Sequence, residues 1–157
     1  AGGSGWAQAG YVTNSMYYMY DAQVEITSND WNELQECCLS IGLTKVTSSD
    51  PYSQQNWYRI YKDRNTGCAY AQKCLNGQIT TAGLGYRPMI GSMMISVDGD
   101  VIKFFIQGNQ VHSWNYELSS YNCYIYAYTS TNRGGSFYGT DVFNTIEYHL
   151  IRPSQSI

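Results

Sequence analysis

Hydrophobic and polar positions alternate most clearly in the stretch Ser92–Trp114, which reads SMMISVDGDVIKFFIQGNQVHSW. From Ile102 to Ile106 every second residue is bulky and apolar, which is the period of a strand and not of a helix. The segments Asp98–Asp100 and Gln107–Asn109 interrupt this pattern, and their Gly and Asn residues accept the positive φ that a hairpin demands. The stretch therefore predicts a β-meander of short strands joined by tight turns.

Short strand-like runs recur along most of the chain, separated by clusters of turn residues at a spacing of roughly 8–12 residues. The single helix signal, at Asn29–Leu39, continues into the apolar run CCLSIGL, which suits a strand better. Many short antiparallel strands without crossover helices predict an all-β fold, a two-sheet antiparallel sandwich. The predicted strands are Ser15–Tyr20, Gln23–Thr27, Cys37–Leu43, Trp57–Tyr61, Gly67–Lys73, Ser92–Val97, Val101–Gln107, Gln110–Trp114, Cys123–Thr129 and Phe143–Ile151.

The length of the chain limits the number of domains, and its charge limits the classes of partner it can bind. The 157 residues suit one domain, so we expect residues 1–10, which begin AGGSG, to be a linker or an added segment and residues 11–157 to form a single β-sandwich domain. The net charge is −3 and Lys and Arg form no run, which argues against nucleic acid as a partner. No stretch reaches the roughly twenty apolar residues of a membrane helix, so we expect no membrane insertion.

The five cysteines are an odd number, so at least one thiol has no partner within the chain. Cys68 and Cys74 would share one face of a single strand, roughly 20 Å apart, which is too far for a disulfide. Their spacing also lacks the clustered ligand pairs of a zinc site. We expect buried free thiols, with one disulfide left as the alternative.

Aromatic residues supply the strongest candidate binding surface. In the run Cys123–Tyr128, small apolar residues suited to the core alternate with three tyrosines that face the other way. Trp57, Arg59 and Tyr61 form a similar alternate set. Such a face can stack on the apolar side of a sugar ring while nearby polar groups read its hydroxyls, although it could also be an outer face stiffened by cross-strand aromatic pairs.

The ordered strands resemble the concanavalin A-like lectin/glucanase jelly-roll superfamily, including its laminin-G-like and SPRY-like members. The resemblance implies a jelly-roll sandwich, and it leaves function open because the fold hosts sugar binders, glycan hydrolases and protein-interaction modules. It is carried by VEITSN (Val24–Asn29), LSIGLT (Leu39–Thr44), WYRIYKDRNTGCAYAQ (Trp57–Gln72), the Ser92–Trp114 meander, YIYAYT (Tyr124–Thr129) and FNTIEYHLI (Phe143–Ile151).

Glycan hydrolases of this superfamily place paired carboxylates on alternate residues of one strand, and the chain has no such run. Asp98 and Asp100 flank a glycine and are better explained as turn residues. We therefore expect a protein that is not an enzyme and has no catalytic residues. We also expect no cofactor, with calcium in the loop from Asn132 to Asp141 as the alternative that the resemblance implies.

We expect a non-enzymatic ligand-binding domain that recognises a glycan or glycoprotein, as the extracellular or cell-surface terminal domain of a fibre or adhesin. One alternative is an SPRY-like protein-interaction module, which could be cytosolic. Another is a structural subunit that buries its tyrosine face in a homotrimer or filament. The candidate ligand-binding residues are Trp57, Arg59, Tyr61, Trp114, Tyr124, Tyr126, Tyr128, Asn132 and Tyr138.

Overall fold

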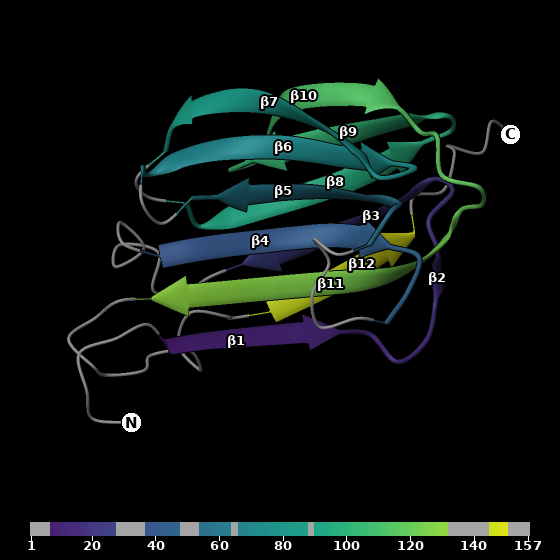
Figure 1. The fold of residues 1–157 in the computed structure, drawn as a ribbon, viewed down its shortest axis with the longest axis horizontal. Helices are drawn as coiled ribbons and strands as arrows, with labels where there is room; N and C mark the ends of the chain where they lie inside the picture. Colours follow the sequence, from purple (N-terminus) through teal and green to yellow (C-terminus); the bar gives the residue numbers. More distant parts are fainter. Residues whose placement is uncertain are drawn as a thin grey trace, which may run out of the picture.

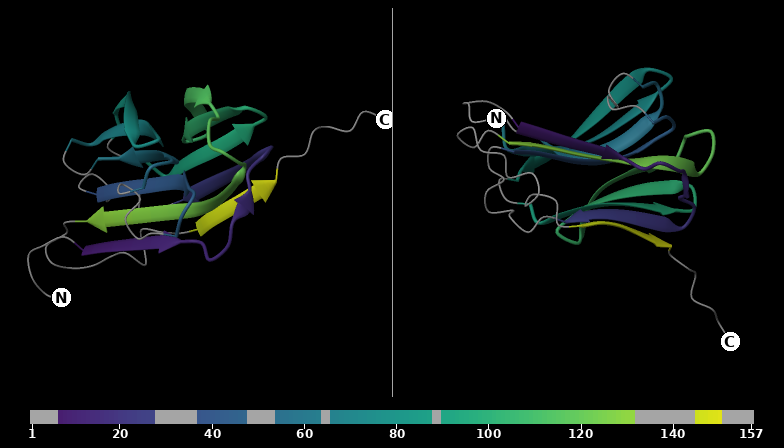
Figure 2. Two further views of the ribbon diagram at one scale, coloured as in Figure 1. Left: turned by 45° about the vertical axis from the view of Figure 1, so that its right-hand side comes forward. Right: turned by 90° about the horizontal axis from the view of Figure 1, so that it is seen from below.

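A computed structural model describes residues 7–27, 37–47, 54–63, 66–87, 90–131 and 145–150. The described elements are all strands, and they form two antiparallel sheets that lie as stacked layers (Figures 1 and 2). The seven-stranded sheet has the order β1-β11-β4-β5-β6-β7, with β2 pairing to β11, and the five-stranded sheet has the order β10-β9-β8-β3-β12. The strands are β1 (Ala7–Val12), β2 (Tyr17–Tyr18), β3 (Ala22–Thr27), β4 (Cys37–Thr44), β5 (Trp57–Lys62), β6 (Cys68–Leu75), β7 (Gln78–Tyr86), β8 (Ser92–Asp98), β9 (Val101–Ile106), β10 (Asn109–Asn115), β11 (Asn122–Thr131) and β12 (Thr145–Leu150).

The core lies between the sheets, where each strand contributes alternate residues. On β11, Cys123, Ile125 and Ala127 are buried in it, which confirms the expected inward set of that strand. On β9, Ile102 and Phe104 are fully buried. The prediction of an all-β sandwich of two antiparallel sheets is confirmed. Nothing in the described part of the chain is a helix long and apolar enough to span a lipid bilayer.

The predicted meander forms β8, β9 and β10 in the five-stranded sheet. Its two turns contain Gly99 at φ 63° and the pair Gln107–Gly108 at φ 52° and 79°, all in the left-handed region. The hairpins fix the pairing of β9 with both neighbours, apart from a register shift between Gln110 and His112. The strand boundaries agree with the expected ones to within a residue or two.

Two strands lie where none is expected from the sequence. β1 begins at Ala7, within the expected linker. It pairs with β11 through backbone hydrogen bonds, which the amino-acid composition of this segment does not indicate. β7 follows Asn76 and Gly77, whose φ angles of 53° and 82° suit a two-residue hairpin turn. In contrast, the strand expected at Ser15–Tyr20 contracts to the two residues of β2.

Other expectations concern the thiols and the helix signal. Cys68, Cys74 and Cys123 are free, as expected. Cys74 and Cys123 are also buried, as expected, whereas Cys68 is only partly buried. The side chains of Cys37 and Cys38 lie outside the described part. Residues 28–36, which carry most of the helix signal, are also outside it. The run that follows them is β4, so its assignment as a strand is confirmed.

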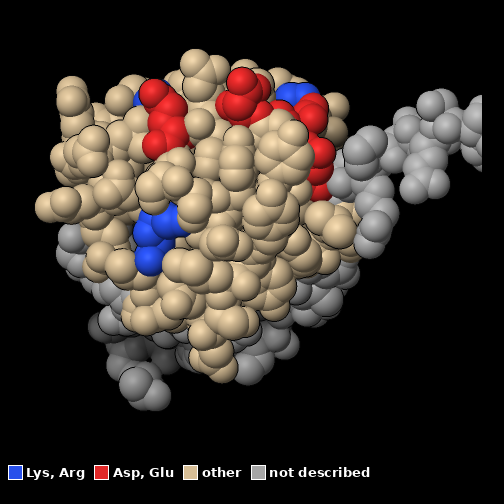
Figure 3. Space-filling view, turned by 90° about the vertical axis from the view of Figure 1, so that its right-hand side faces the viewer, with Lys and Arg blue, Asp and Glu red and all other residues tan. Residues whose placement is uncertain are grey.

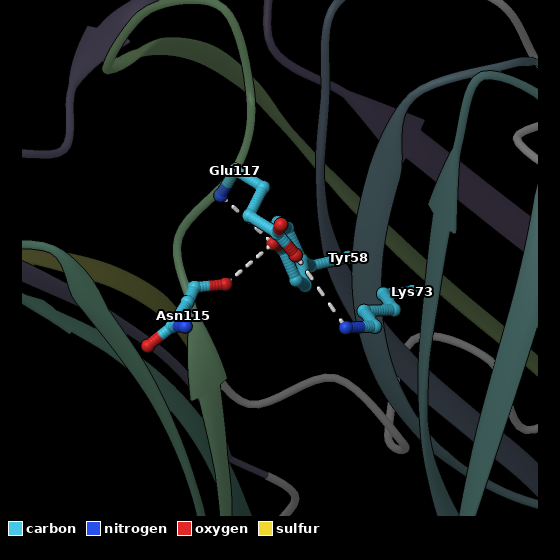
Figure 4. Close-up of polar contacts among 4 residues, drawn as sticks. All are labelled: Tyr58, Lys73, Asn115 and Glu117. Carbon is cyan, nitrogen blue, oxygen red and sulfur yellow. Dashed lines mark hydrogen bonds and ion pairs between the residues drawn. The ribbon is translucent and has the colours of Figure 1, made fainter.

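A tyrosine ties the two sheets together at the end of β10 (Figure 4). The Tyr58 hydroxyl donates to the Asn115 carbonyl at 2.8 Å and accepts from the Glu117 amide at 3.0 Å. Glu117 also pairs with Lys73 at 3.5 Å between Nζ and Oε2. Burial raises the pKa of Tyr58 to about 12, so the hydroxyl keeps its proton and donates even in mildly alkaline solution. The connection after β10 is thus fastened to β5.

His112 lies beside this connection, on β10. Its ring meets Trp114 edge-on at 4.4 Å and lies 6.3 Å from Phe104, and the Lys73 ammonium lies 5.0 Å above the Trp114 ring. Burial and, secondarily, the positive charge of Lys73 lower the pKa of His112. The folded state therefore favours neutral imidazole at this position.

We expect Tyr58→Phe to lower the free energy of unfolding by about 1–3 kcal/mol, because it leaves a backbone carbonyl and a backbone amide without their partner. Urea denaturation measures this. Tyr70→Phe, on the outer face of the same sheet, is the matched control and should cost less. Equal losses for the two variants would contradict a bridging role for Tyr58.

We also expect acid to destabilise the protein through His112. A lowered pKa in the folded state means that the unfolded state binds the proton more readily, so this contribution to stability is complete above pH 6.5 and declines as pH falls below it. The difference between the free energies of unfolding at pH 7.5 and pH 5.0 should be smaller in His112→Phe than in the unsubstituted protein. His149→Phe is the control, and the same reduction there would refute the assignment to His112.

Candidate functional site

The outer face of the seven-stranded sheet carries a row of side chains that crosses five strands. The pairing register aligns Tyr126 on β11, Gly42 on β4, Arg59 on β5, Gln72 on β6 and Thr81 on β7. Their neighbours along each strand, such as Ile60 on β5, point into the core. The row is called the central row below.

Arg59 is the most constrained residue of the central row. Its guanidinium carbon lies 3.9 Å from the centroid of the Tyr61 ring and 5.4 Å from that of Trp57. Its Nε donates to Oε1 of Gln72 at 2.8 Å, and Nε2 of Gln72 donates to Oγ1 of Thr81 at 2.9 Å. The guanidinium, the amide and the hydroxyl are therefore held in one orientation, from buried Arg59 to exposed Thr81.

An aromatic pair borders the polar part of the central row. Tyr61 and Tyr70 face each other across β5 and β6 with ring centroids 5.4 Å apart and an interplanar angle of 29°. Both side chains are partly exposed. A ring surface next to fixed planar polar groups can contact the C–H face of a sugar while the polar groups bind its hydroxyls.

Small residues on β4 leave room between the tyrosines of β11 and the outer side chains of β5. Ser40, Gly42 and Thr44 lie between these strands, whose backbones are about 10 Å apart at the usual strand spacing. A Cβ on Gly42 would lie 2.7 Å from the Tyr58 carbonyl oxygen and 3.0 Å from Cβ of Arg59. Gly42 therefore provides the space beneath Arg59.

A surface pocket of about 430 Å³ lies where β4 ends and β5 begins. Its described lining includes Lys45, Val46 and the segment Gln54–Asn56. The Gln54 carbonyl accepts from Nε1 of Trp57 at 3.0 Å, which connects the pocket wall to the aromatic residues of the outer face. The pocket thus adds amide and ammonium groups at one end of this face.

The structure brings together six of the predicted ligand-binding residues. Trp57, Arg59 and Tyr61 occupy the outer positions of β5, and Tyr124, Tyr126 and Tyr128 occupy those of β11. Trp57 is only 1% exposed and Tyr126 is also buried, so the rings accessible to solvent are Tyr61, Tyr124 and Tyr128.

The remaining predicted residues are not part of this face. Trp114 lies on β10 in the other sheet, where its ring contacts Phe104 edge-on at 5.6 Å. It does so because the alternate positions of β10 that include Trp114 point toward the core. Asn132 and Tyr138 lie outside the described residues.

Sequence reasoning missed Tyr70, Gln72 and Thr81. Tyr70 and Gln72 alternate along CAYAQKC, so their shared face was readable from the period of two. Thr81 lies on the unpredicted β7, and the Asn-Gly turn before it was the available signal.

We expect Gly42→Ala to destabilise the protein by about 1–3 kcal/mol, because the added methyl group meets backbone atoms that cannot move aside cheaply. Gly83→Ala on β7 is the matched control, since a Cβ there meets nothing within 4 Å. Thermal and urea denaturation of both variants measure the difference. A Gly42→Ala protein as stable as Gly83→Ala would show that the close contact with Arg59 is relieved at no cost.

No protein-family model matches the chain, and no curated protein matches it by sequence. Solved structures do match its fold. Galectin-Ib of Xenopus laevis aligns with 90% of this chain and 100% of its own, at TM-score 0.57 and 14% identity. The carbohydrate-binding module CBM66 of Bacillus subtilis aligns over 90% and 81%, at TM-score 0.55 and 13% identity.

A third similar structure comes from work on endo-acting O-glycanases of the human gut microbiota. It aligns over 92% of this chain and 74% of its own, at TM-score 0.63 and 8% identity. At these identities the likeness concerns the fold. The chain folds as a jelly-roll sandwich of the type found in galectins and carbohydrate-binding modules.

Proposed function

We propose that the protein binds glycans without cleaving them, through the outer face of its seven-stranded sheet. The observation that carries the proposal is the hydrogen-bonded series Arg59–Gln72–Thr81 beside the Tyr61–Tyr70 pair. Planar donors and acceptors in fixed orientations suit the hydroxyl pattern of a sugar, and the ring surfaces suit its apolar side. The structural likeness to galectins and to CBM66 supports this choice of ligand class.

Binding rather than hydrolysis is favoured by the chemistry of the central row. Most glycoside hydrolases use two carboxyl groups that flank the scissile bond. The side chains that the structure describes on this face are aromatic, hydroxyl, amide, thiol, aliphatic and guanidinium groups, with no Asp or Glu among them. These groups can hold a sugar but supply no acid and base for cleaving it.

The setting of this binding is also a proposal. We place the domain at a cell surface or outside the cell, at the end of a fibre or adhesin, where a glycan or glycoprotein is accessible. The competing functions are an SPRY-like protein-interaction module and a homotrimer that buries its tyrosine face. The partial exposure of Tyr124 and Tyr128 in the single chain suits either a ligand or a subunit contact.

The test begins with a multivalent glycan array, with and without calcium, followed by calorimetry on the glycans that bind. Gln72→Ala removes one hydrogen-bonding side chain and frees Arg59 from its orientation, so we expect about a tenfold loss of affinity. Tyr61→Ala should weaken binding by a similar factor, because it removes both a ring surface and the support of Arg59.

Gln110→Ala is the matched control, because Gln110 is exposed on β10 of the opposite sheet. Its affinity should equal that of the unsubstituted protein. If no glycan binds at high valency, the proposal fails. If glycans bind and Gln72→Ala binds them equally well, glycan recognition lies elsewhere on the molecule.

A further inference from the structure

A second surface stands out at the end of the sandwich where β2 lies. Seven large hydrophobic side chains are exposed among the described residues, and three of them fall in the short run Met16–Tyr20. Met16, Tyr18 and Tyr20 are 42%, 55% and 41% exposed. A concentration of exposed apolar residues in so short a run is typical of an interaction surface.

Tyr18, Tyr20 and Tyr121 form a three-ring cluster at this end. Tyr20 meets Tyr121 edge-on at 5.1 Å, and the Tyr18 ring lies 6.3 Å from Tyr20 and 6.4 Å from Tyr121. Tyr121 in turn stacks on buried Tyr116 at 4.6 Å and 12°. The cluster is therefore supported from the interior.

The backbone of the run is fastened as well. The amide of buried Met19 donates to the Tyr121 carbonyl at 2.8 Å, and the Tyr148 hydroxyl donates to the Tyr18 carbonyl at 2.6 Å. The Ala22 amide closes the following turn on the Met19 carbonyl at 3.1 Å. The exposed rings are thus presented on a fixed backbone, which lowers the entropy cost of binding a partner.

Two carboxylates, those of Asp21 and Asp100, lie near the cluster. Oδ1 of Asp21 accepts from the Gly99 amide at 2.9 Å, which brings the turn before β3 next to the turn that carries Asp100. The pKa of Tyr121 is raised first by partial burial and then by the charge of Asp100, by the neighbouring Tyr20 and Tyr18 hydroxyls and, least, by the charge of Asp21. Both carboxylates therefore act on the cluster, and Asp100 does so more strongly. Figure 3 shows acidic side chains gathered along one edge of the molecule, with basic side chains next to some of them.

Most lysines near this end already have partners. Lys103 pairs with Asp98 at 3.0 Å, and Lys73 pairs with Glu117 at 3.5 Å. Lys45 donates to Oγ of Ser120 at 2.7 Å and to the Asn122 carbonyl. Among the described residues, no lysine or arginine forms a salt bridge with Asp21 or Asp100. The surface therefore combines exposed aromatic rings with negative charge that the described cations do not neutralise.

We propose that this end binds a basic segment of a partner protein, with Lys or Arg side chains placed against Tyr18 and Tyr20 and near Asp100. Aromatic faces and carboxylates both attract cations, so their combination selects a positively charged partner. The rings lie open to solvent, which suits a protein surface better than a small ammonium ion. A second copy of the chain would bring like charges together, because an isologous contact pairs the same patch with itself.

The test uses hexalysine as the probe, hexaglutamate as the charge-reversed control and NMR of the tyrosine rings as the readout. We expect hexalysine to shift the ring signals of Tyr18 and Tyr20, and hexaglutamate to leave them unchanged. The double variant Tyr18→Ser/Tyr20→Ser should lose about tenfold in affinity through two lost cation–π contacts. This loss is followed by calorimetry and by the ring signal of Tyr121, which the variant retains. Asp100→Asn should weaken binding several-fold and reduce its dependence on salt.

The matched control is Tyr86→Ser, which removes a 68% exposed tyrosine on β7 and should bind hexalysine normally. Equal binding by the double variant would overturn the proposal, because charge alone would then explain it. Tetramethylammonium that binds as tightly as hexalysine would also overturn it, in favour of a site for small cations. Self-association abolished by the double variant would assign the surface to a second copy instead.

Discussion

The pairing register of β11, β4, β5, β6 and β7 is the constraint on which the rest of the structure depends. Side chains alternate between the two faces of the sheet, so burying one row of residues in the core places the neighbouring row on the outer face. Ala127, Ile41, Ile60, Ala71 and Ala82 form an inner row across the same five strands. A slip of one residue would turn the Arg59 guanidinium toward the core at a cost far above that of any surface contact. The energetics of the core thus fix the geometry of the outer face.

A second consequence of this register is the rigidity of Arg59. A guanidinium that lies against two aromatic rings, and whose Nε–H donates to the side-chain oxygen of Gln72, cannot turn freely toward solvent. Gly42 makes this arrangement possible, because any side chain there would occupy the space that Arg59 requires. The conformational entropy of the Arg59 side chain is lost on folding, so the outer face is already ordered before a ligand binds.

The sequence predicts much of the fold and part of the candidate site. A period of two is a local signal, so the meander and the two faces of β11 could be derived from neighbouring residues alone. The central row could not, because it joins residues from strands far apart in sequence whose register only the folded sheet defines. Trp114 illustrates the same limit. Its strand was predicted, yet which of its faces meets the core depends on the partner sheet.

The sixteen tyrosines of this chain therefore do not all indicate the same kind of binding surface. On β5 and β6, Tyr61 and Tyr70 lie beside a guanidinium that already covers one face of the Tyr61 ring. At the end of the sandwich, Tyr18 and Tyr20 lie near carboxylates, and no Lys or Arg of the described residues lies over their rings. The first environment favours neutral polar ligands, whereas the second favours cations. The local charge, not the number of aromatic residues, separates the two surfaces.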